Sequence, residues 1–261
     1  MGRIIVLASG KGGTGKTTIT ANLGIALAMK KQRVLLIDAD IAMSNLSLHL
    51  GMQSAPITLH EVLLGEAGIE DAIYDGPKGV ELIPSGLSLE TYRRIDSERL
   101  KSVVSSLKEN YDFILLDAPA GVEKNVMSAL SAGEELILVT DPSSPSIADA
   151  LKTKIIAQKL GSRPIGIIIN FVHGEKGEIQ KEQIMKLLEL PSYGTIPYDA
   201  EVRKSFMSET VQPVMIRKPD SPASKEIMKV ADKLIGIEVQ EEKPKKESFI
   251  KALLSRLFGK K

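Results

Sequence analysis

The sequence predicts an α/β fold with a single doubly wound, mostly parallel sheet and helices on both faces. Apolar runs of strand length alternate with segments whose apolar residues recur at helical spacing, which is the order of a parallel sheet covered by helices. The strand-like runs are almost continuously apolar, as strands buried on both faces are. At 261 residues, 43% of them hydrophobic, the chain can bury one large core, so we expect one domain.

The expected elements follow in chain order. Strands are expected at Arg3–Ala8, Arg33–Asp38, Gly79–Pro84, Tyr111–Asp117, Glu135–Thr140, Pro164–Asn170 and Tyr193–Pro197. Helices are expected at Thr17–Met29, Ser97–Glu109, Ile147–Leu160, Glu178–Leu190 and Ser221–Leu234. Residues 41–51 show no obvious element of their own. The chain therefore divides into a folded domain at 1–237, a polar and flexible linker at 238–247, and a terminal segment at 248–261.

A glycine-rich loop joins the first strand to the first helix. It reads GKGGTGKTT and fits the phosphate-loop pattern G-x-x-x-x-G-K-[ST]. In such loops backbone N–H groups cradle phosphates, a lysine reaches the β and γ oxygens, and the next hydroxyl binds Mg²⁺; Lys16 and Thr17 fill these two positions. The helix N-terminus adds its dipole. We expect nucleotide phosphates to be bound by Gly10, Lys11, Gly12, Gly13, Thr14, Gly15, Lys16, Thr17 and Thr18.

The loop carries a second lysine, Lys11, directly after its first glycine. A flexible ammonium at the mouth of the loop would more naturally point outward than back at its own nucleotide. Its position therefore suggests that a neighbouring subunit is involved in the site.

Two strands end in aspartate, at the edge of the sheet where α/β proteins bind ligands. Asp117 closes the run FILLD and is expected to join Thr17 at Mg²⁺, directly or through water; the alternative is an ordinary capping role in the next turn. Asp38 and Asp40 follow the second strand and could orient water or hold metal. Asp40 is the better candidate, because Asp38 is still tied to the strand end. Residues 118–121 could sense a γ-phosphate, although the pattern alone indicates only a turn.

Composition excludes several classes of function. The chain has no cysteine, which removes disulfides, thiolate metal sites and iron–sulfur clusters. The N-terminus has neither a signal-peptide pattern nor a myristoylation motif, so a cytoplasmic chain is expected. The histidines at 49, 60 and 173 show no metal-ligand spacing, and we interpret them as structural or surface residues. Residues 241–261 hold seven Lys/Arg and three Glu, which leaves a slightly acidic body unsuited to DNA and a basic tail suited to an anionic partner.

Together, the two loop lysines, the D-x-D after the second strand and the D-A-P-A-G after the Asp117 strand resemble the MinD/ParA ATPases. These are phosphate-loop NTPases with a deviant Walker A loop. The details are most similar to the MinD branch: DADIAMSNLSLHLG at 38–51 and DAPAGVE at 117–123 resemble its two switches, and IPYDAE at 196–201 resembles its base-side loop. The resemblance extends from Arg3 to about Leu234.

The resemblance implies a slow, partner-stimulated ATP hydrolase that dimerises on binding ATP. Lys11 would reach the partner's nucleotide, Lys16 would neutralise the β and γ phosphates, and Asp40 would be the hydrolytic aspartate and a possible metal contact. Mg²⁺ would lie at Thr17 and Asp117. For the base, the resemblance implies adenine recognition by Asn170, with Pro197 and Tyr198 at its border. One departure is Ala118, where many relatives carry serine.

The terminal segment SFIKALLSRLFGKK has the pattern of an interfacial amphipathic helix. At 14 residues and about 1.5 Å per residue it would reach roughly 21 Å, too short for a bilayer core of roughly 30 Å. An ordinary helix packed on the body is the alternative, but the segment also resembles the membrane-targeting tail of MinD. Its apolar half-wheel and cationic edges consist of Phe249, Ile250, Lys251, Leu253, Leu254, Arg256, Leu257 and Phe258.

The function implied is spatial regulation of cell division at the inner face of the membrane, with a protein effector or cargo. Three alternatives share the nucleotide site: a ParA-like DNA-partitioning ATPase, a flagellar-placement ATPase, and a nucleotide-gated scaffold with negligible turnover. The acidic body and the apolar face of the tail count against DNA binding, and Asp40 favours hydrolysis over the scaffold. Electron-donating relatives require cysteine ligands, which this chain does not have.

Overall fold

The computed structural model describes residues 2–40, 44–52, 55–86, 97–121, 124–207 and 210–238. The terminal segment at 248–261 and nearly all of the linker therefore lie outside the described residues. Within the described part, no helix combines the length and the apolarity that crossing a bilayer requires.

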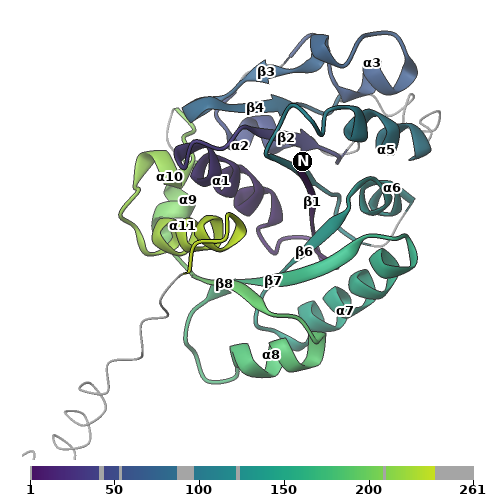
Figure 1. Ribbon diagram of the computed structural model, residues 1–261. Helices are drawn as coiled ribbons and strands as arrows, with labels where there is room; N and C mark the ends of the chain where they lie inside the picture. The colour runs from purple at the N-terminus through teal and green to yellow at the C-terminus, as the bar shows by residue number, and fades with distance from the viewer. Residues whose placement is uncertain are drawn as a thin grey trace, which may run out of the picture.

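One eight-stranded sheet forms the centre of the molecule, in the order β3-β4-β2-β5-β1-β6-β7-β8 (Figure 1). Neighbouring strands are parallel, except that the edge strand β3 runs antiparallel to β4. The prediction of a single, mostly parallel sheet is confirmed. The strands are β1 Arg3–Ala8, β2 Val34–Asp38, β3 Tyr74–Asp75, β4 Val80–Ile83, β5 Phe113–Asp117, β6 Glu135–Thr140, β7 Arg163–Val172 and β8 Ser192–Pro197.

Helices cover both faces of this sheet (Figure 1). One face carries α1 Lys16–Met29, α2 Leu46–His49, α10 Val214–Arg217 and α11 Pro222–Leu234. The other carries α3 Leu59–Leu64, α5 Ser97–Ser106, α6 Lys124–Ala132, α7 Ser144–Lys159 and α8 Lys181–Leu188. The short helix α9 Ala200–Lys204 follows β8, and 3₁₀ turns occupy Glu70–Ala72 and Pro77–Gly79.

Alternation along the strands divides the core in two. In β1, Ile4 and Val6 face the layer of α3, α5, α6, α7 and α8, whereas Ile5 and Leu7 face the layer of α1 and α11. All four side chains are fully buried. A strand buried on both faces needs apolar residues at every position, which is why these runs read as continuously apolar in the sequence.

The structure differs from the sequence prediction mainly in short elements. Residues 41–51 were expected to have no element, yet they contain α2, a single helical turn whose Leu46 is buried. The helices α6 and α3 and the two-residue strand β3 were not predicted. Helix α3 begins with a capping box, in which the Thr58 hydroxyl accepts from the N–H of His60 and the Glu61 carboxylate accepts from the N–H of Thr58 at 2.7 Å.

The parallel strands all begin at one side of the sheet, here called the amino edge, and all finish at the other, the carboxyl edge. The carboxyl edge holds the site described below. At the opposite edge, Arg3 donates to Glu135 at 2.6 Å and to the carbonyl oxygen of Leu234 at 2.7 Å, and Arg163 pairs with the same glutamate. The guanidinium of Arg3 also lies over the ring of Phe113. These contacts fix the end of α11, and with it the end of the described chain, at the amino edge.

Candidate functional site

The glycine-rich loop bends around the N-terminus of α1, beyond the end of β1. Gly15 is the residue before the helix and has a φ of 84°, a left-handed conformation that glycine adopts without strain. A side chain there would also press on Phe171, whose ring would lie 3.1 Å from an added Cβ. The loop encloses a pocket of about 330 Å³. Its lining is Ser9, Gly12, Gly13, Thr14, Gly15, Lys16, Thr17, Thr18, Asp40, Asn45, His49 and Ala120.

Asp117, at the end of β5, lies beneath this loop and is 1% exposed. Its Oδ1 accepts from Lys16 Nζ at 2.8 Å and from the Thr20 hydroxyl at 2.9 Å, and its Oδ2 accepts from the Thr17 hydroxyl at 2.6 Å. Because Lys16 is itself only 7% exposed, this is a buried ion pair with additional hydrogen bonds. The carboxylate therefore fixes the side chains of the first turn of α1.

The pair Thr17 and Asp117 fits a hard cation such as Mg²⁺. Hydroxyl and carboxylate oxygens are its preferred ligands, and Mg²⁺ commonly takes one or two protein ligands with water and phosphate completing the shell. In the described ranges, this site included, no three His, Cys, Asp or Glu side chains are grouped as a metal site. A cation at this site would thus depend on a bound phosphate for the rest of its ligands.

Asp38, at the end of β2, is fully buried and anchors the segment that follows it. Its Oδ1 accepts from the N–H of Asp40 at 3.0 Å. Its Oδ2 accepts from the Ser44 hydroxyl at 2.9 Å and from the N–H groups of Asn45 and Leu46, each at 3.1 Å. One carboxylate therefore sets the backbone at both ends of the D-x-D segment and the start of α2.

The two acids of the D-x-D differ in environment. Burial, with a further contribution from the charge of Asp117, raises the pKa of Asp38 to about 7, although the hydrogen bonds to it act in the opposite direction. Asp40 is half-buried and lines the phosphate pocket. The structure thus places Asp38 inside the protein and Asp40 at the pocket wall.

A second pocket, of about 280 Å³, adjoins the first, because Thr18 lines both. Asn170 is at its edge and is 5% exposed; its Nδ2 donates to the Thr14 carbonyl oxygen of the loop at 2.8 Å. The expected base-side residues Asn170, Pro197 and Tyr198 therefore come together here. The rest of the lining is mostly apolar: Ile19, Phe171, Ile196, Asp199, Val202, Arg203, Phe206 and Ile227.

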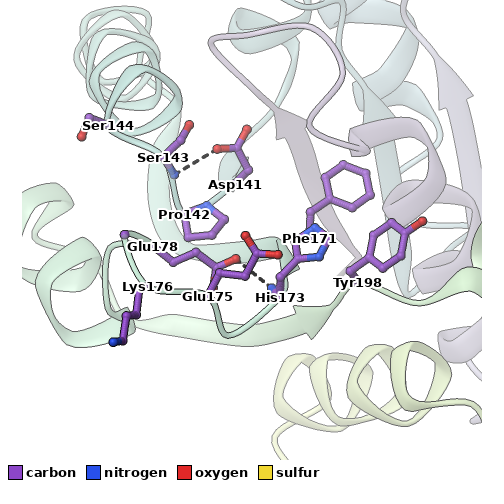
Figure 2. Close-up of a pocket in the computed structure, with 11 residues that line it drawn as sticks. Asp141, Pro142, Ser143, Ser144, Phe171, His173, Glu175, Lys176, Glu178 and Tyr198 are labelled. Atoms are coloured by element: carbon purple, nitrogen blue, oxygen red, sulfur yellow. Dashed lines mark hydrogen bonds between the residues drawn. The ribbon is translucent and has the colours of Figure 1, made fainter.

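A wider hollow of about 620 Å³ lies on the other side of Phe171 and Tyr198, at the ends of β6 and β7. Figure 2 shows the rings of Phe171, His173 and Tyr198 together on one side of it. The His173 and Tyr198 rings stack at 4.6 Å. Glu178 accepts from the N–H groups of His173 and Gly174, and these bonds hold the loop that follows β7. The bond to His173 is drawn in Figure 2. Tyr198 thus forms a wall between this hollow and the base-side pocket.

The remaining expected site residues lie apart from these pockets. Lys11 is exposed at the mouth of the loop. Gly10 packs against α7, where a side chain would collide with the backbone of Asp149. The expected membrane face lies outside the described residues: Phe249, Ile250, Lys251, Leu253, Leu254, Arg256, Leu257 and Phe258.

Sequence reasoning missed His49, which lines the phosphate pocket. Its Nδ1 lies 3.4 Å from the Thr18 hydroxyl, and its ring packs on Phe206 at 4.5 Å. Burial lowers the pKa of this imidazole. The sequence did contain a signal, because His49 lies within residues 38–51, which resemble a nucleotide switch. The histidines were considered only for metal-ligand spacing, and that criterion does not detect a single histidine beside a nucleotide.

The chain is similar to known nucleotide-binding proteins, and the matched residues include most of those that line the pockets described above. Residues 5–212 match the family model described as CobQ/CobB/MinD/ParA nucleotide binding domain. An uncharacterised ATP-binding protein of Methanocaldococcus jannaschii is 46% identical over 258 residues, which is 98% of this chain and 97% of the relative. The septum site-determining protein MinD of Synechocystis is 35% identical over 209 residues, covering 77% of this chain and 78% of the relative.

Among solved structures, the septum site-determining protein MinD of Pyrococcus horikoshii, complexed with Mg-ADP, is similar to this chain. The TM-score is 0.85 at 40% identity, with 92% of this chain and 100% of that chain covered. The range matched by the family model, residues 5–212, contains the glycine-rich loop, both acidic strand ends and Asn170.

Proposed function

The chain belongs to the CobQ/CobB/MinD/ParA nucleotide-binding family, and on this premise we propose that it is a MinD-like ATPase that dimerises around ATP and binds membranes peripherally. Hydrolysis would release it from the membrane, and its role would be the spatial regulation of cell division. The observation that carries the proposal is the arrangement of Lys16, Thr17 and Asp117 under a glycine loop, next to an apolar pocket edged by Asn170.

In this proposal one ATP molecule lies across the two adjoining pockets. Its phosphates occupy the pocket at the N-terminus of α1, where N–H groups and the helix dipole favour an anion. Its adenine occupies the apolar pocket beside Asn170, Pro197 and Tyr198. Thr18, which lines both, would lie beside the part of the nucleotide that joins base to phosphates.

Metal and phosphate binding would be coupled through Lys16. This ammonium contacts Asp117 at 2.8 Å. A divalent cation held by Thr17 and Asp117 would bring more positive charge next to it, so Lys16 would turn to the β and γ phosphates. Mg²⁺ would supply charge neutralisation at the transferred phosphate, while the lysine holds that phosphate in place.

Hydrolysis would depend on Asp40. Its backbone is held by Asp38 and it lines the phosphate pocket, and both observations support a role in orienting an attacking water. Lys11, exposed at the mouth of the loop, would complete the site of the facing subunit. A protein effector would be needed for rapid turnover.

Membrane binding would follow from dimerisation. A single amphipathic tail binds a bilayer only weakly, whereas two tails on one dimer gain an avidity of roughly 10²- to 10⁴-fold. The ATP state would therefore remain at the membrane, and the ADP state would leave it.

Liposome sedimentation tests this part of the proposal. Full-length protein and a chain truncated before Phe249 are each incubated with anionic vesicles, Mg²⁺ and either ATP or ADP. We expect sedimentation only for the full-length chain with ATP. Equal vesicle binding with ATP and ADP would contradict nucleotide gating. Equal vesicle binding by the truncated and full-length chains would contradict the role of the tail.

Phosphate release distinguishes an ATPase from a nucleotide-gated scaffold. We expect slow release by the wild-type chain with lipid present, and at least a tenfold lower rate for Asp40→Ala, by analogy with the loss of other water-orienting groups. Retained ATP-dependent liposome binding by Asp40→Ala serves as the control for folding. Equal rates for the two chains would favour the scaffold.

A further inference from the structure

An imidazole stands where the phosphate pocket meets the base-side pocket. His49 lines the phosphate pocket, and Phe206, whose ring packs on it at 4.5 Å, lines the base-side pocket. Thr18 lines both pockets, and its hydroxyl lies 3.4 Å from His49 Nδ1. His49 therefore lies at the junction of the two pockets.

The segment that carries His49 is fixed at both ends. At its start, Asp38 accepts from the N–H of Leu46, and the Leu46 side chain is fully buried. At its end, Leu50 is 4% exposed and Gly51 has a φ of 71°. A side chain on Gly51 would collide with the carbonyl oxygen of Val211, so the two backbones are closely packed. These contacts fix the backbone on both sides of His49 and so restrict the position of its imidazole.

The ring has hydrogen-bonding capacity to offer a ligand. Burial lowers the pKa of this imidazole and so favours the neutral ring, which has one N–H donor and one acceptor. Asp117 and Lys16 are the charged groups that act on it, with opposite effects. When the Thr18 hydroxyl donates to Nδ1, the ring proton is on Nε2, which can then donate to a sugar or phosphate oxygen.

We propose that His49 binds the portion of the nucleotide that ADP and ATP share, the ribose and the α-phosphate. This inference rests on the proposed function, because it takes one nucleotide to lie across both pockets. The effect of losing His49 on nucleotide affinity should differ from that of losing Lys16, because Lys16 would reach the terminal phosphates. Loss of His49 should weaken ADP and ATP equally.

Calorimetric titration of the full-length protein tests this, with Mg-ADP and a non-hydrolysable Mg-ATP analogue as probes. His49→Leu removes both ring nitrogens and keeps an apolar side chain, and it should weaken both ligands about tenfold, the value of one hydrogen bond to a charged or polar group. His49→Gln keeps a side-chain donor and should recover most of the affinity. The ratio of the two affinities should be that of the wild type in every variant.

His49→Phe is the matched control, because it keeps an aromatic ring that can pack on Phe206 and removes both ring nitrogens. It should lose as much affinity as His49→Leu, and wild-type affinity in His49→Phe would overturn the proposal, since packing would then explain the effect. So would wild-type affinity in His49→Leu, failure of His49→Gln to recover binding, or a loss confined to the ATP analogue. A wild-type chain that binds neither nucleotide would refute the proposed function itself, which separates the two failures.

Discussion

Two buried carboxylates organise the site by different means. Asp117 collects side-chain donors from the first turn of α1, whereas Asp38 collects mainly backbone N–H groups from the segment after β2. They lie close enough that the charge of Asp117 helps to raise the pKa of Asp38. A change at either acid is therefore expected to alter both the first turn of α1 and the D-x-D segment.

Removal of Asp117 should destabilise the fold strongly. Asp117→Ala leaves the ammonium of Lys16 buried and unpaired, and breaking a buried pair in this way typically costs about 3–5 kcal/mol. Thr20→Val is the control: it removes one hydrogen bond to the same carboxylate and should cost about 1 kcal/mol. Urea denaturation of the metal-free proteins measures both free energies of unfolding. Similar costs for the two variants would show that the ion pair contributes little.

Individual site residues could be predicted from the sequence where a sequence motif specifies them. Lys16 and Thr17 follow from the loop pattern, and the structure places Asp117 beside both of them. His49 could not be found in this way, because its position depends on the docking of α2 and on Phe206, 157 residues away in the sequence. Contacts of that kind arise from tertiary packing and leave no local pattern.

Among the secondary elements, Asp199 links two helices at the base-side pocket. Its Oδ1 accepts from the N–H of Glu201 in the first turn of α9 at 2.9 Å, and its Oδ2 accepts from the N–H of Ala223 in the first turn of α11 at 3.1 Å. One carboxylate therefore caps α9 and also accepts from the N-terminus of α11, whose own N-cap is Ser221, next to Tyr198 at the pocket wall.

Asp199→Ala should remove the cap of α9 and one hydrogen bond to the N-terminus of α11, which keeps its Ser221 cap. At about 1 kcal/mol for each of the two interactions, the free energy of unfolding should fall by about 2 kcal/mol, and ADP should bind more weakly because α9 and α11 both line the base-side pocket. Asp199→Asn keeps one acceptor oxygen and should lose about half as much stability. Thermal unfolding and ADP titration check this. Stability unchanged in Asp199→Ala would contradict the role given to the cap.

Long elements were predicted and short ones were missed. The helices α1, α7 and α11 have 13 to 16 residues, enough to show a helical period. Helix α2 has four residues and begins where Leu46 donates its N–H to Asp38, so its existence depends on a partner eight residues back. The nine-residue α6 is amphipathic but spans only about two and a half turns, which is too short for a helical period to be distinguished with ease.

Considered as a whole, the molecule separates structural and functional contacts. The phosphate pocket and the base-side pocket both lie at the carboxyl edge of the sheet, next to the exposed Lys11. The amino edge carries the ion pairs of Glu135 with Arg3 and Arg163. A second subunit that engages Lys11 would therefore approach the carboxyl edge.

Lys11→Ala should abolish the proposed ATP-dependent dimer without affecting the fold. Because Lys11 is exposed, its loss should change the free energy of unfolding by no more than about 0.5 kcal/mol, and each subunit should still bind ADP. With ATP, light scattering should report a monomer, and vesicle binding should be lost. Lys159→Ala, an exposed lysine at the end of α7, is the control and should behave as wild type. An ATP-dependent dimer of Lys11→Ala would refute the role of this lysine.

The contact between Arg3 and the end of α11 has a geometric consequence for any such dimer. Two subunits joined at their carboxyl edges would release their tails from the outer, amino edges, on opposite ends of the assembly. If residues 238–247 tether each tail, as the sequence predicts, the contour length of each tether would be at most about 36 Å. A tether of that length would limit the orientations in which both anchors of the proposed dimer could reach one bilayer, and with them the membrane curvature that the dimer tolerates.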